Sequence, residues 1–537
     1  MGQCWMLSKV MAGAFLVGFG PPDMEAAAIT QITHYASATG FWSEPVTDDG
    51  KVVWYAHLTS VNLLPNYYVY DIASGQATQI TSYTGGDGYW GEPVIEGGKV
   101  AWYFNDTDVN GLPDYYVYDI ASGQTTRFAS YSGTNGFWSA PVVAGGKVVW
   151  FINTANGSDL PNYFIHDTAT GVTTPITAYS GLRGVWSKPV VEGGKVVWYA
   201  NPSDRRGNPN YFSYDIASGV TTRITSYTGR SGFRSDPVGG DGLVAWYCNP
   251  DNTSDTPNYY VFDTATGVIT QITSYTSSVG FWSEPVVADG KVVWYVNTTD
   301  DTGPPDCFVY DVASGQTTQI ANFSGPGGFW SEPVADDGKV AWYAHPSSVD
   351  LLPNYYVYDT ASGQTVQITS YTGGNGYCGL PVIERGKVVW YSNATDVTAL
   401  PQYYFYDIAG AQATQITNYN GNDGFWSDPV VADGKVVWYI NATNNTDMPN
   451  YYVSALETAR FVVTSFVGSP ASGYTIEWTA EPGYSYQVSY SETLAAGSWI
   501  DIGPPLSVTA SESVLSYFDA ISAPGPRRFY RVSRVGN

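Results

Sequence analysis

Residues 40–81 read GFWSEPVTDDGKVVWYAHLTSVNLLPNYYVYDIASGQATQIT, and the chain repeats this stretch along most of its length. The aromatic pair Phe41–Trp42 returns 48 residues later as Tyr89–Trp90, and the same interval leads to the last pair, Phe425–Trp426. The chain holds nine such copies without a gap. An uninterrupted period of this length is typical of a repeat architecture.

Each copy predicts four short strands. In the first copy they cover residues 42–46, 52–56, 67–71 and 78–83. One Gly-containing turn joins the first strand to the second, and another joins the third to the fourth. Apolar side chains occupy both faces of the second and third strands, whereas the fourth strand alternates apolar with polar residues. Small sheets covered on both faces, with a wetter outer strand, favour propeller blades. A solenoid is the alternative, but it would need polar capping repeats at its ends.

The two ends of the repeat region complement each other. Residues 29–35 match the fourth strand of a unit, but no first three strands precede them. The ninth copy has its first three strands and then loses the pattern at Ser454. We therefore predict an all-β fold in which residues 29–460 form one closed propeller of nine four-stranded blades, the last blade shared between both ends.

The composition excludes several classes of partner. With 48 acidic and 23 basic residues the chain has a net charge of −25, and only 13% of its residues are charged. Nucleic acids and anionic membrane surfaces both require basic patches, so neither is an expected partner. Aromatic residues reach 16%, which indicates a folded chain with extensive aromatic packing.

Residues 1–28 have the pattern of a secretory leader. Lys9 precedes a short apolar run, and three alanines at 26–28 offer a cleavage site. The run is too short to span a bilayer, so we expect no membrane insertion. A disordered leader is the alternative. The prediction is a secreted protein, extracellular or periplasmic. Cys248, Cys307 and Cys378 would remain, and their odd number and spacing favour buried apolar positions over a disulfide framework.

The unit Trp-Ser-Glu-Pro-Val, Asp-Gly-Lys-Val-Val-Trp-Tyr, Tyr-Val-Tyr-Asp-Ile-Ala-Ser-Gly-Gln and Gln-Ile-Thr, as it stands in residues 42–81, resembles the TolB-type β-propeller repeat. The resemblance implies a propeller. It implies little about function, since that family includes periplasmic adaptors and peptidase-associated propellers, and no catalytic residue of a member maps here. Residues 461–537 are similar to fibronectin-III-like β-sandwich modules at the C-terminus of secreted bacterial proteins, on scattered residues such as Trp478, Trp499 and Tyr530.

A recurrent acidic position follows the Trp-Ser pair. It holds Glu44, Glu92, Asp236, Glu284, Glu332 and Asp428, and it is interrupted by Ala140, Lys188 and Leu380. In a propeller the first strand lines the central channel, where paired carboxylates could serve glycoside hydrolysis. Their near-equivalence favours a solvated acidic rim instead, because an active site is one asymmetric constellation. The sequence therefore assigns no catalytic residue.

The loop between the second and third strands differs from unit to unit, as at residues 57–64, 104–112, 201–208 and 249–256. A constant scaffold with variable loops on one face is typical of a binding surface. We therefore predict a secreted, non-enzymatic binding or scaffold protein that recognises a protein or a glycan through this face. The alternative is an extracellular enzyme, a hydrolase or lyase, that acts on polysaccharide at the central channel. The oligomeric state is not predicted.

One of these loops predicts a calcium site. Asp106, Asp108, Asn110 and Asp114 lie in a D-x-D-x-N-G-x-x-D pattern, which resembles the front of the calcium loops in EF-hand-like and integrin-type propeller repeats. Oxygen ligands at alternate positions suit a hard cation, and the carbonyl of Leu112 would add another. Val117 stands where the twelfth-position acid would be. The alternative is an ordinary polar loop, because Asp and Asn are common turn formers.

Overall fold

The computed structural model describes residues 6–10, 14–18, 29–36, 39–59, 63–86, 88–107, 110–155, 159–180, 183–201, 208–228, 232–249, 255–299, 304–322, 328–345, 351–374, 376–395, 397–444, 446–456, 463–469, 473–480, 485–491, 500–507, 514–520 and 529–535. In these residues the regular elements are all strands. The chain divides into two compact units, one of residues 29–454 and one that combines residues 1–28 with 455–537. The all-β class predicted from the sequence is confirmed.

The first repeat shows how one unit is built. Its sheet has the order β4 (Phe41–Trp42), β6 (Lys51–His57), β7 (Asn66–Asp71) and β8 (Gln76–Gln79), and β5 (Val46–Asp48) also pairs with β6. All of these pairings are antiparallel. The unit is thus the predicted four-stranded meander, except that its first strand is split into two pieces.

The split lies at the Ser-Glu-Pro segment, and its cause is local. Pro45 has no amide hydrogen to donate to β6. Ser43 compensates, because its backbone N–H donates to the carbonyl of Tyr55 at 3.0 Å while its Oγ accepts the N–H of Tyr55, also at 3.0 Å. A break of this kind changes the direction of the side chain that lies within it, which here is the side chain of Glu44.

The other units keep these strand positions, except that the first inner piece of the fourth unit is reduced to an isolated bridge between Trp186 and Ala200. The first piece of the inner strand recurs as β9 (Tyr89–Trp90), β14 (Phe137–Trp138), β23 (Phe233–Arg234), β28 (Phe281–Trp282), β33 (Phe329–Trp330), β38 (Tyr377–Cys378) and β43 (Phe425–Trp426). The second piece recurs as β10 (Val94–Glu96), β15 (Val142–Ala144), β19 (Val190–Glu192), β24 (Val238–Gly240), β29 (Val286–Ala288), β34 (Val334–Asp336), β39 (Val382–Glu384) and β44 (Val430–Ala432). The long central strand recurs as β11 (Lys99–Asn105), β16 (Lys147–Asn153), β20 (Lys195–Ala200), β25 (Leu243–Asn249), β30 (Lys291–Asn297), β35 (Lys339–His345), β40 (Lys387–Asn393) and β45 (Lys435–Asn441).

The two outer strand positions are as regular. The third strand recurs as β12 (Asp114–Asp119), β17 (Asn162–Asp167), β21 (Asn210–Asp215), β26 (Asn258–Asp263), β31 (Asp306–Asp311), β36 (Asn354–Asp359), β41 (Gln402–Asp407) and β46 (Asn450–Ala455). The fourth recurs as β13 (Gln124–Ala129), β18 (Val172–Pro175), β22 (Val220–Arg223), β27 (Ile269–Gln271), β32 (Gln316–Ala321), β37 (Gln364–Gln367) and β42 (Gln412–Gln415). In the ninth unit β3 (Ile29–Gln31), from the start of the repeat region, pairs with β46.

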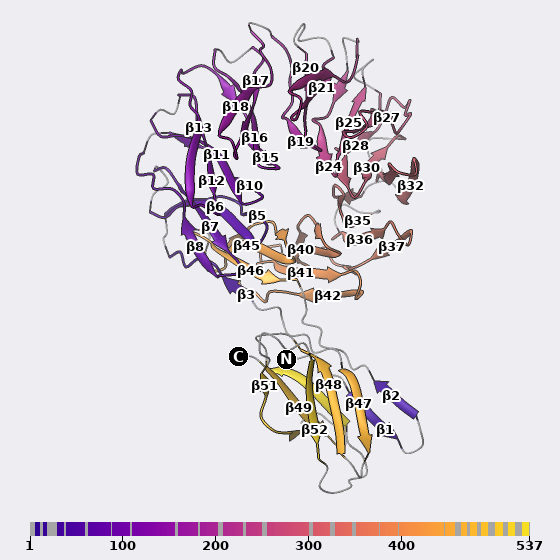
Figure 1. Cartoon of the computed structure of the whole chain (residues 1–537). Coiled ribbons are helices and arrows are strands. Elements are labelled where there is room, and N and C mark those ends of the chain that lie inside the picture. Colours follow the sequence, from indigo (N-terminus) through magenta and orange to yellow (C-terminus); the bar gives the residue numbers. More distant parts are fainter. Residues whose placement is uncertain are drawn as a thin grey trace. The chain divides into compact units, whose positions relative to one another are not determined.

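Successive sheets pack side by side through the second inner pieces. Each of these pieces, from β5 to β44, contacts its counterpart in the next sheet, and β44 in turn contacts β5. Figure 1 shows β5, β10, β15, β19 and β24 toward the centre of this unit, with β8, β13, β32 and β37 toward its outside. Residues that follow the first inner pieces therefore lie on the inner edge of the arrangement.

The tryptophan of each central strand belongs to the core between two sheets. Trp54 packs with Val52 in the cluster that also contains Tyr451, whereas Val53 and Tyr55 pack on the opposite side with Trp102. The nine tryptophans at this position have exposed fractions of 1% or less. The prediction that both faces of the central strand are buried is confirmed, and each sheet is held by its neighbours on two sides.

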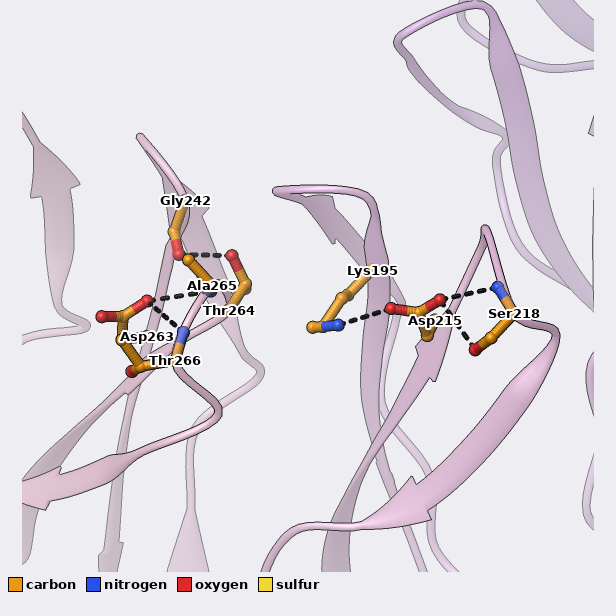
Figure 2. A network of polar contacts seen from close by, with 8 residues as sticks. All are labelled: Lys195, Asp215, Ser218, Gly242, Asp263, Thr264, Ala265 and Thr266. Carbon is orange, nitrogen blue, oxygen red and sulfur yellow. Dashed lines mark hydrogen bonds and ion pairs between the residues drawn. The ribbon is translucent and has the colours of Figure 1, made fainter.

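An aspartate recurs at the turn between the third and fourth strands and accepts backbone N–H groups there, as Figure 2 shows for two adjacent units. In one, Asp215 accepts the backbone N–H of Ser218 at 2.7 Å and forms an ion pair with Lys195 at 2.7 Å. In the next, Asp263 accepts the N–H groups of Ala265 and Thr266 at 2.9 and 3.2 Å. These aspartates therefore stabilise the turn by accepting its backbone N–H groups.

The equivalent aspartate of the sixth unit supports a prediction on pH dependence. The Lys291 ammonium, 2.7 Å from Asp311, and the Ser314 N–H hold the pKa of Asp311 down at about 2. A depressed pKa stabilises the fold above the unfolded-state value, near 4, and this contribution disappears as the pH falls through about 2. Lys291→Leu copies the fifth unit, where Leu243 stands at this position.

We expect Lys291→Leu to lower the free energy of unfolding at neutral pH by less than about 1 kcal/mol, because the pair is partly exposed. The difference from wild type should shrink as the pH approaches about 2, where Asp311 becomes protonated in both proteins. Urea titrations at both pH values measure it. A difference that stays constant with pH would show that the ion pair is not its source.

The second unit has two sheets. One contains β1 (Met6–Val10), β2 (Ala14–Gly18), β49 (Ser485–Ser491), β50 (Ile500–Asp501), β51 (Leu506–Ser507) and β53 (Phe529–Val535), and the other contains β47 (Val463–Ser469), β48 (Gly473–Thr479) and β52 (Val514–Asp519). Trp478 from one sheet and Tyr486, Val488 and Tyr530 from the other share one buried core. The fibronectin-III-like assignment stays a prediction.

The leader and the domain boundaries also stay predictions. Residues 6–10 and 14–18 pair with each other, and Leu7 pairs with Tyr530 of β53. Within the described ranges there is no helix of the length and apolarity needed to cross a membrane. Cys248 and Cys307 are buried as predicted, whereas Cys378 is only partly buried.

Candidate functional site on the inner edge of the sheets

The acidic position of the repeat lies in the break between the two inner pieces. At each unit the flanking serine or glycine and proline are buried, whereas the residue between them is exposed. The break described for Ser43 thus presents one side chain per sheet to solvent. Because all of these breaks lie on the inner edge, the acids of different units share one region of the molecule.

A tyrosine from the preceding sheet binds most of these carboxylates. The hydroxyl of Tyr55 donates to Glu92 at 3.0 Å, and that of Tyr247 donates to Glu284 at 3.3 Å. Tyr439 of the ninth unit donates to Glu44 of the first at 2.8 Å, so the same bond joins the two ends of the repeat region. The acids are thus part of the contact between neighbouring sheets.

These carboxyl groups are harder to ionise than ordinary ones. Partial desolvation of these accessible carboxyl groups by the surrounding protein raises the pKa of Glu44, Glu92 and Glu284, and the hydrogen bond from the tyrosine only partly offsets this effect. Burial also raises the pKa of Asp236. An accessible carboxyl with a raised pKa can remain protonated at higher pH, which is a requirement for a general acid.

The acids form two arcs along the inner edge, separated by the units with Ala140, Lys188 and Leu380. The first arc is Asp428, Glu44 and Glu92, and the second arc is Asp236, Glu284 and Glu332. In each arc the negative charges of both flanking acids further raise the pKa of the central glutamate. Each arc therefore combines a carboxyl that tends to stay protonated with neighbours that favour that state when ionised.

The sequence predicted the acidic rim but missed the tyrosines. Tyr55 and its counterparts looked like core residues of the central strand, and their hydroxyls reach acids 37 residues further along, as from Tyr55 to Glu92. One signal was present in the sequence. Phe151 replaces the tyrosine in the third unit, and the residue it would serve in the fourth unit is Lys188.

Aromatic side chains line the same edge. Phe41 stacks on Trp90 of the next sheet with ring centroids 4.9 Å apart, and Phe233 stacks on Trp282 at the same distance. Phe425 of the ninth unit stacks on Trp42 of the first at 5.0 Å. These rings are partly exposed. Such faces suit the apolar faces of sugar rings.

The predicted calcium loop is only partly described. Asp108 lies outside the described residues, Asp106 is exposed, and Asp114 forms an ion pair with Arg127 at 3.0 Å. Among the described residues there is no cluster of three or more His, Cys, Asp or Glu side chains that could hold a metal. Calcium binding by Asp106, Asp108, Asn110 and Asp114 stays a prediction.

Comparisons with known proteins address the fold. No protein-family model and no curated protein matches the chain. Among solved structures, it is similar to one of two prolyl endopeptidases, with 12% identity, 67% of this chain and 55% of that chain covered and a TM-score of 0.42. It is similar to the β-propeller domain of the trilobed protease from Pyrococcus furiosus, with 12% identity, 71% and 99% coverage and a TM-score of 0.38.

TolB from Acinetobacter baumannii also matches, with 12% identity, 61% of this chain and 79% of that chain covered and a TM-score of 0.28. The matched structures thus include a β-propeller domain and TolB. The chain spans 55% and 58% of the length of the first two matched structures, the prolyl endopeptidase and a puromycin hydrolase mutant.

The prediction of a non-enzymatic binding or scaffold protein was wrong. The matched structures are mainly enzymes, including puromycin hydrolase, a post-proline cleaving enzyme and oligogalacturonate lyase. Parts of the variable loops that motivated that prediction lie outside the described residues, among them residues 202–207 and 250–254. Because similarity at this level of identity shows the fold alone, any case for a particular chemistry has to come from the chain's own residues.

Proposed function

We propose that this chain is an enzyme that cleaves an extracellular polysaccharide, with its active site on the inner edge of the sheets. The observation that carries the proposal is the pair of carboxylate arcs, whose central glutamates are accessible, are hydrogen-bonded by a tyrosine and have raised pKa values. The predicted leader supports an extracellular substrate, and the partly exposed aromatic rings on the same edge support a sugar.

The chemistry that fits this arrangement best is glycoside hydrolysis. That reaction uses two carboxyl groups, one protonated to donate a proton to the leaving oxygen and one ionised to act as base or nucleophile. Within an arc, Glu284 or Glu44 would be the acid, and a flanking carboxylate such as Asp236 or Asp428 would be the ionised partner. The alternative chemistry is elimination by a lyase, and the substrate screen described below distinguishes it from hydrolysis.

We further infer that residues 29–454 form a closed nine-bladed propeller and that residues 463–535 form a β-sandwich. Contact between β44 and β5, the pairing of β3 with β46 and the bond from Tyr439 to Glu44 support closure. The core shared by Trp478 and Tyr486 supports a sandwich. Closure matters for function, because it brings the acids of the first and ninth units into one arc.

A substrate screen tests the proposed function. Purified protein is incubated with a panel of neutral and acidic polysaccharides, and new reducing ends and unsaturated products are measured separately. Reducing ends without unsaturation are expected from hydrolysis. Unsaturated products would replace hydrolysis by elimination, and the absence of both across the panel would contradict the proposal.

Carboxylate variants identify the acid. We expect Glu284→Gln or Glu44→Gln to lower kcat by about 10²–10⁴-fold, because the amide cannot donate a proton in the same way. Tyr247→Phe removes a hydrogen bond that lowers the pKa of Glu284. If Glu284 is the acid, this variant should move the alkaline limb of the pH–rate profile to higher pH.

Tyr103→Phe is the matched control. Tyr103 occupies the same strand position as Tyr247, but the next unit has Ala140 in place of an acid. Its pH profile should match that of the wild type. Equal shifts for both variants would assign the effect to general loosening of the edge rather than to Glu284.

A further inference from the structure

Four departures from the repeat meet around the fourth and fifth units. Phe151 stands where the other units have tyrosine, and Val185 stands where they have Phe or Tyr. Lys188 is the one basic residue at the acidic position, and Arg234 is the one basic residue at the position of Trp42. A single substitution in one repeat would be unremarkable, but these lie at consecutive contacts along one edge.

The stacking between sheets changes at this junction. At seven junctions an aromatic ring of one sheet stacks on the tryptophan of the next, as Phe137 does on Trp186 at 4.7 Å, whereas the eighth unit has Cys378 in place of that tryptophan. Between the fourth and fifth units the corresponding residues are Val185 and Arg234, so this pair of rings is absent. The Arg234 guanidinium carbon lies instead 5.2 Å from the ring centroid of Tyr199. In the next unit the indole of Trp282 lies edge-on to Tyr247 at 6.1 Å. The guanidinium has thus taken the place of an indole.

The junction between the fourth and fifth units also carries two cations beside an acid. Asp236 interacts with the Tyr199 hydroxyl, with the Lys188 side chain and backbone N–H, and with Arg234. Asp236 thus interacts electrostatically with two cations, of which Lys188 is exposed and Arg234 is partly buried. The rest of the edge carries acids or neutral residues, in a chain with a net charge of −25. An anion would therefore be repelled along most of this edge and attracted here.

The chemistry of the two cations indicates what they bind. A guanidinium stacked on an aromatic ring retains N–H donors in a planar fork that matches carboxylate or sulfate, and a lysine adds a point charge. Asp236 and the Tyr199 hydroxyl do not exhaust the donors of Arg234 and Lys188, which together number eight. Asp236 also raises the pKa of Glu284, so the cations adjoin the second arc.

We propose that Lys188 and Arg234 form a subsite for the anionic group of a sugar, a uronate carboxylate or a sulfate ester, and that the substrate is therefore an acidic polysaccharide cleaved at the second arc. This inference rests on the proposed function for the cleavage step, but not for the binding step. It also separates the two arcs, since the first arc has no adjoining cations of this kind among its equivalent positions.

Calorimetry with matched sugars tests the subsite. The probes are an oligomer of galacturonic acid, its methyl ester with the same backbone and no charge, and a sulfated oligosaccharide. We expect the wild type to bind at least one of the two anionic probes about tenfold or more tightly than the ester, and more weakly as salt is added. Which anionic probe binds more tightly distinguishes a carboxylate from a sulfate subsite.

The variants Lys188→Glu and Arg234→Trp restore the residues of the other repeats, so they are expected to fold. Each should weaken binding of the anionic probe by about tenfold or more. Arg223→Gln is the control for Arg234→Trp, because Arg223 is exposed on the outer strand β22 and both variants remove one positive charge. It should bind like the wild type.

The subsite would be overturned if neither anionic probe bound more tightly than the ester, or if the tighter anionic probe bound equally to the wild type and the double variant. The absence of binding by both anionic probes would overturn it as well. Anion binding that depends on Lys188 and Arg234 without any cleavage would overturn only the proposed enzymatic function. Cleavage of neutral polysaccharide with no preference for acidic ones would overturn only the subsite.

Discussion

Removal of residues 29–35 is expected to lower the melting temperature and to cause aggregation. In the wild type, Ile29 and Gln31 of β3 pair with β46, and Ile32 donates its N–H to Tyr451 at 2.8 Å. Trp54 also donates to the hydroxyl of Tyr35 at 3.0 Å. Without this segment the edge of β46 and the cluster around Ile32 become exposed. An unpaired edge strand beside apolar surface is an aggregation site.

Thermal melting and size-exclusion chromatography measure this effect. A truncated protein that stays monomeric and melts at the wild-type temperature would mean that β3 does not hold the two ends together.

Asn450→Ala weakens the same contact between the two ends less severely than the truncation does, and Asn66→Ala within the first unit is its control. The Oδ1 of Asn450 accepts the N–H of Tyr35 at 2.6 Å and the Thr33 hydroxyl at 3.2 Å, across more than 400 residues of sequence. Asn66 makes the same bonds to Tyr83 and Thr81 within the first unit. Both variants lose equivalent bonds, worth about 1–3 kcal/mol where a buried group is left unsatisfied. Asn450→Ala should be the more damaging, because it also frees the closing strand.

The second large effect is expected for Trp246→Ala. The side chain of Trp246 is fully buried, stacks on Tyr211 with ring centroids 4.3 Å apart and on Tyr260 at 6.0 Å, and donates from Nε1 to the Tyr227 hydroxyl at 3.4 Å. Its loss leaves a cavity between two sheets that neither sheet can close alone. We expect a loss of about 3–5 kcal/mol in the free energy of unfolding.

The urea midpoint of Trp246→Ala is the measurement. Val268→Ala serves as a control, since Val268 is 56% exposed and its truncation should change stability by less than about 0.5 kcal/mol. Trp246→Phe should lie between the two, because it keeps an aromatic ring in the contact. An unchanged midpoint for Trp246→Ala would mean that the central-strand tryptophans are not the core between sheets.

The local structure of the repeat could be predicted closely. Asp71 and Gly75 mark the turn between the third and fourth strands, and the structure has Ser74 N–H donating to Asp71 there. The alternation of Val52, Val53, Trp54 and Tyr55 predicted burial on both faces, and both faces are buried. The division of the first strand at Pro45 was not predicted. The pattern of residues 42–46 looked like one strand, but Ser43 Oγ supports the ladder where Pro45 cannot.

The sequence identified the acidic residues of the candidate site but not the contacts that make them differ from one another. The acids at the position of Glu44 were predicted to form a solvated rim, because the sequence presents them as near-equivalent. Their surroundings differ because of residues in other sheets, such as the Tyr439 hydroxyl beside Glu44 and the Arg234 guanidinium over Tyr199. Lys188 and Arg234 appeared in the sequence only as exceptions to a pattern.

The sequence by itself determined the period, the four strand positions of each unit, the turns and the buried tryptophan of the central strand. Those features depend on residues within one repeat, where alternation and turn chemistry act over a few positions. Only the tertiary structure decided which tyrosine bonds which acid and where the cations gather. These contacts join residues such as Tyr439 and Glu44, 395 positions apart, and they depend on how whole sheets pack against each other. A pattern that repeats every 48 residues does not specify which residues of different repeats come into contact.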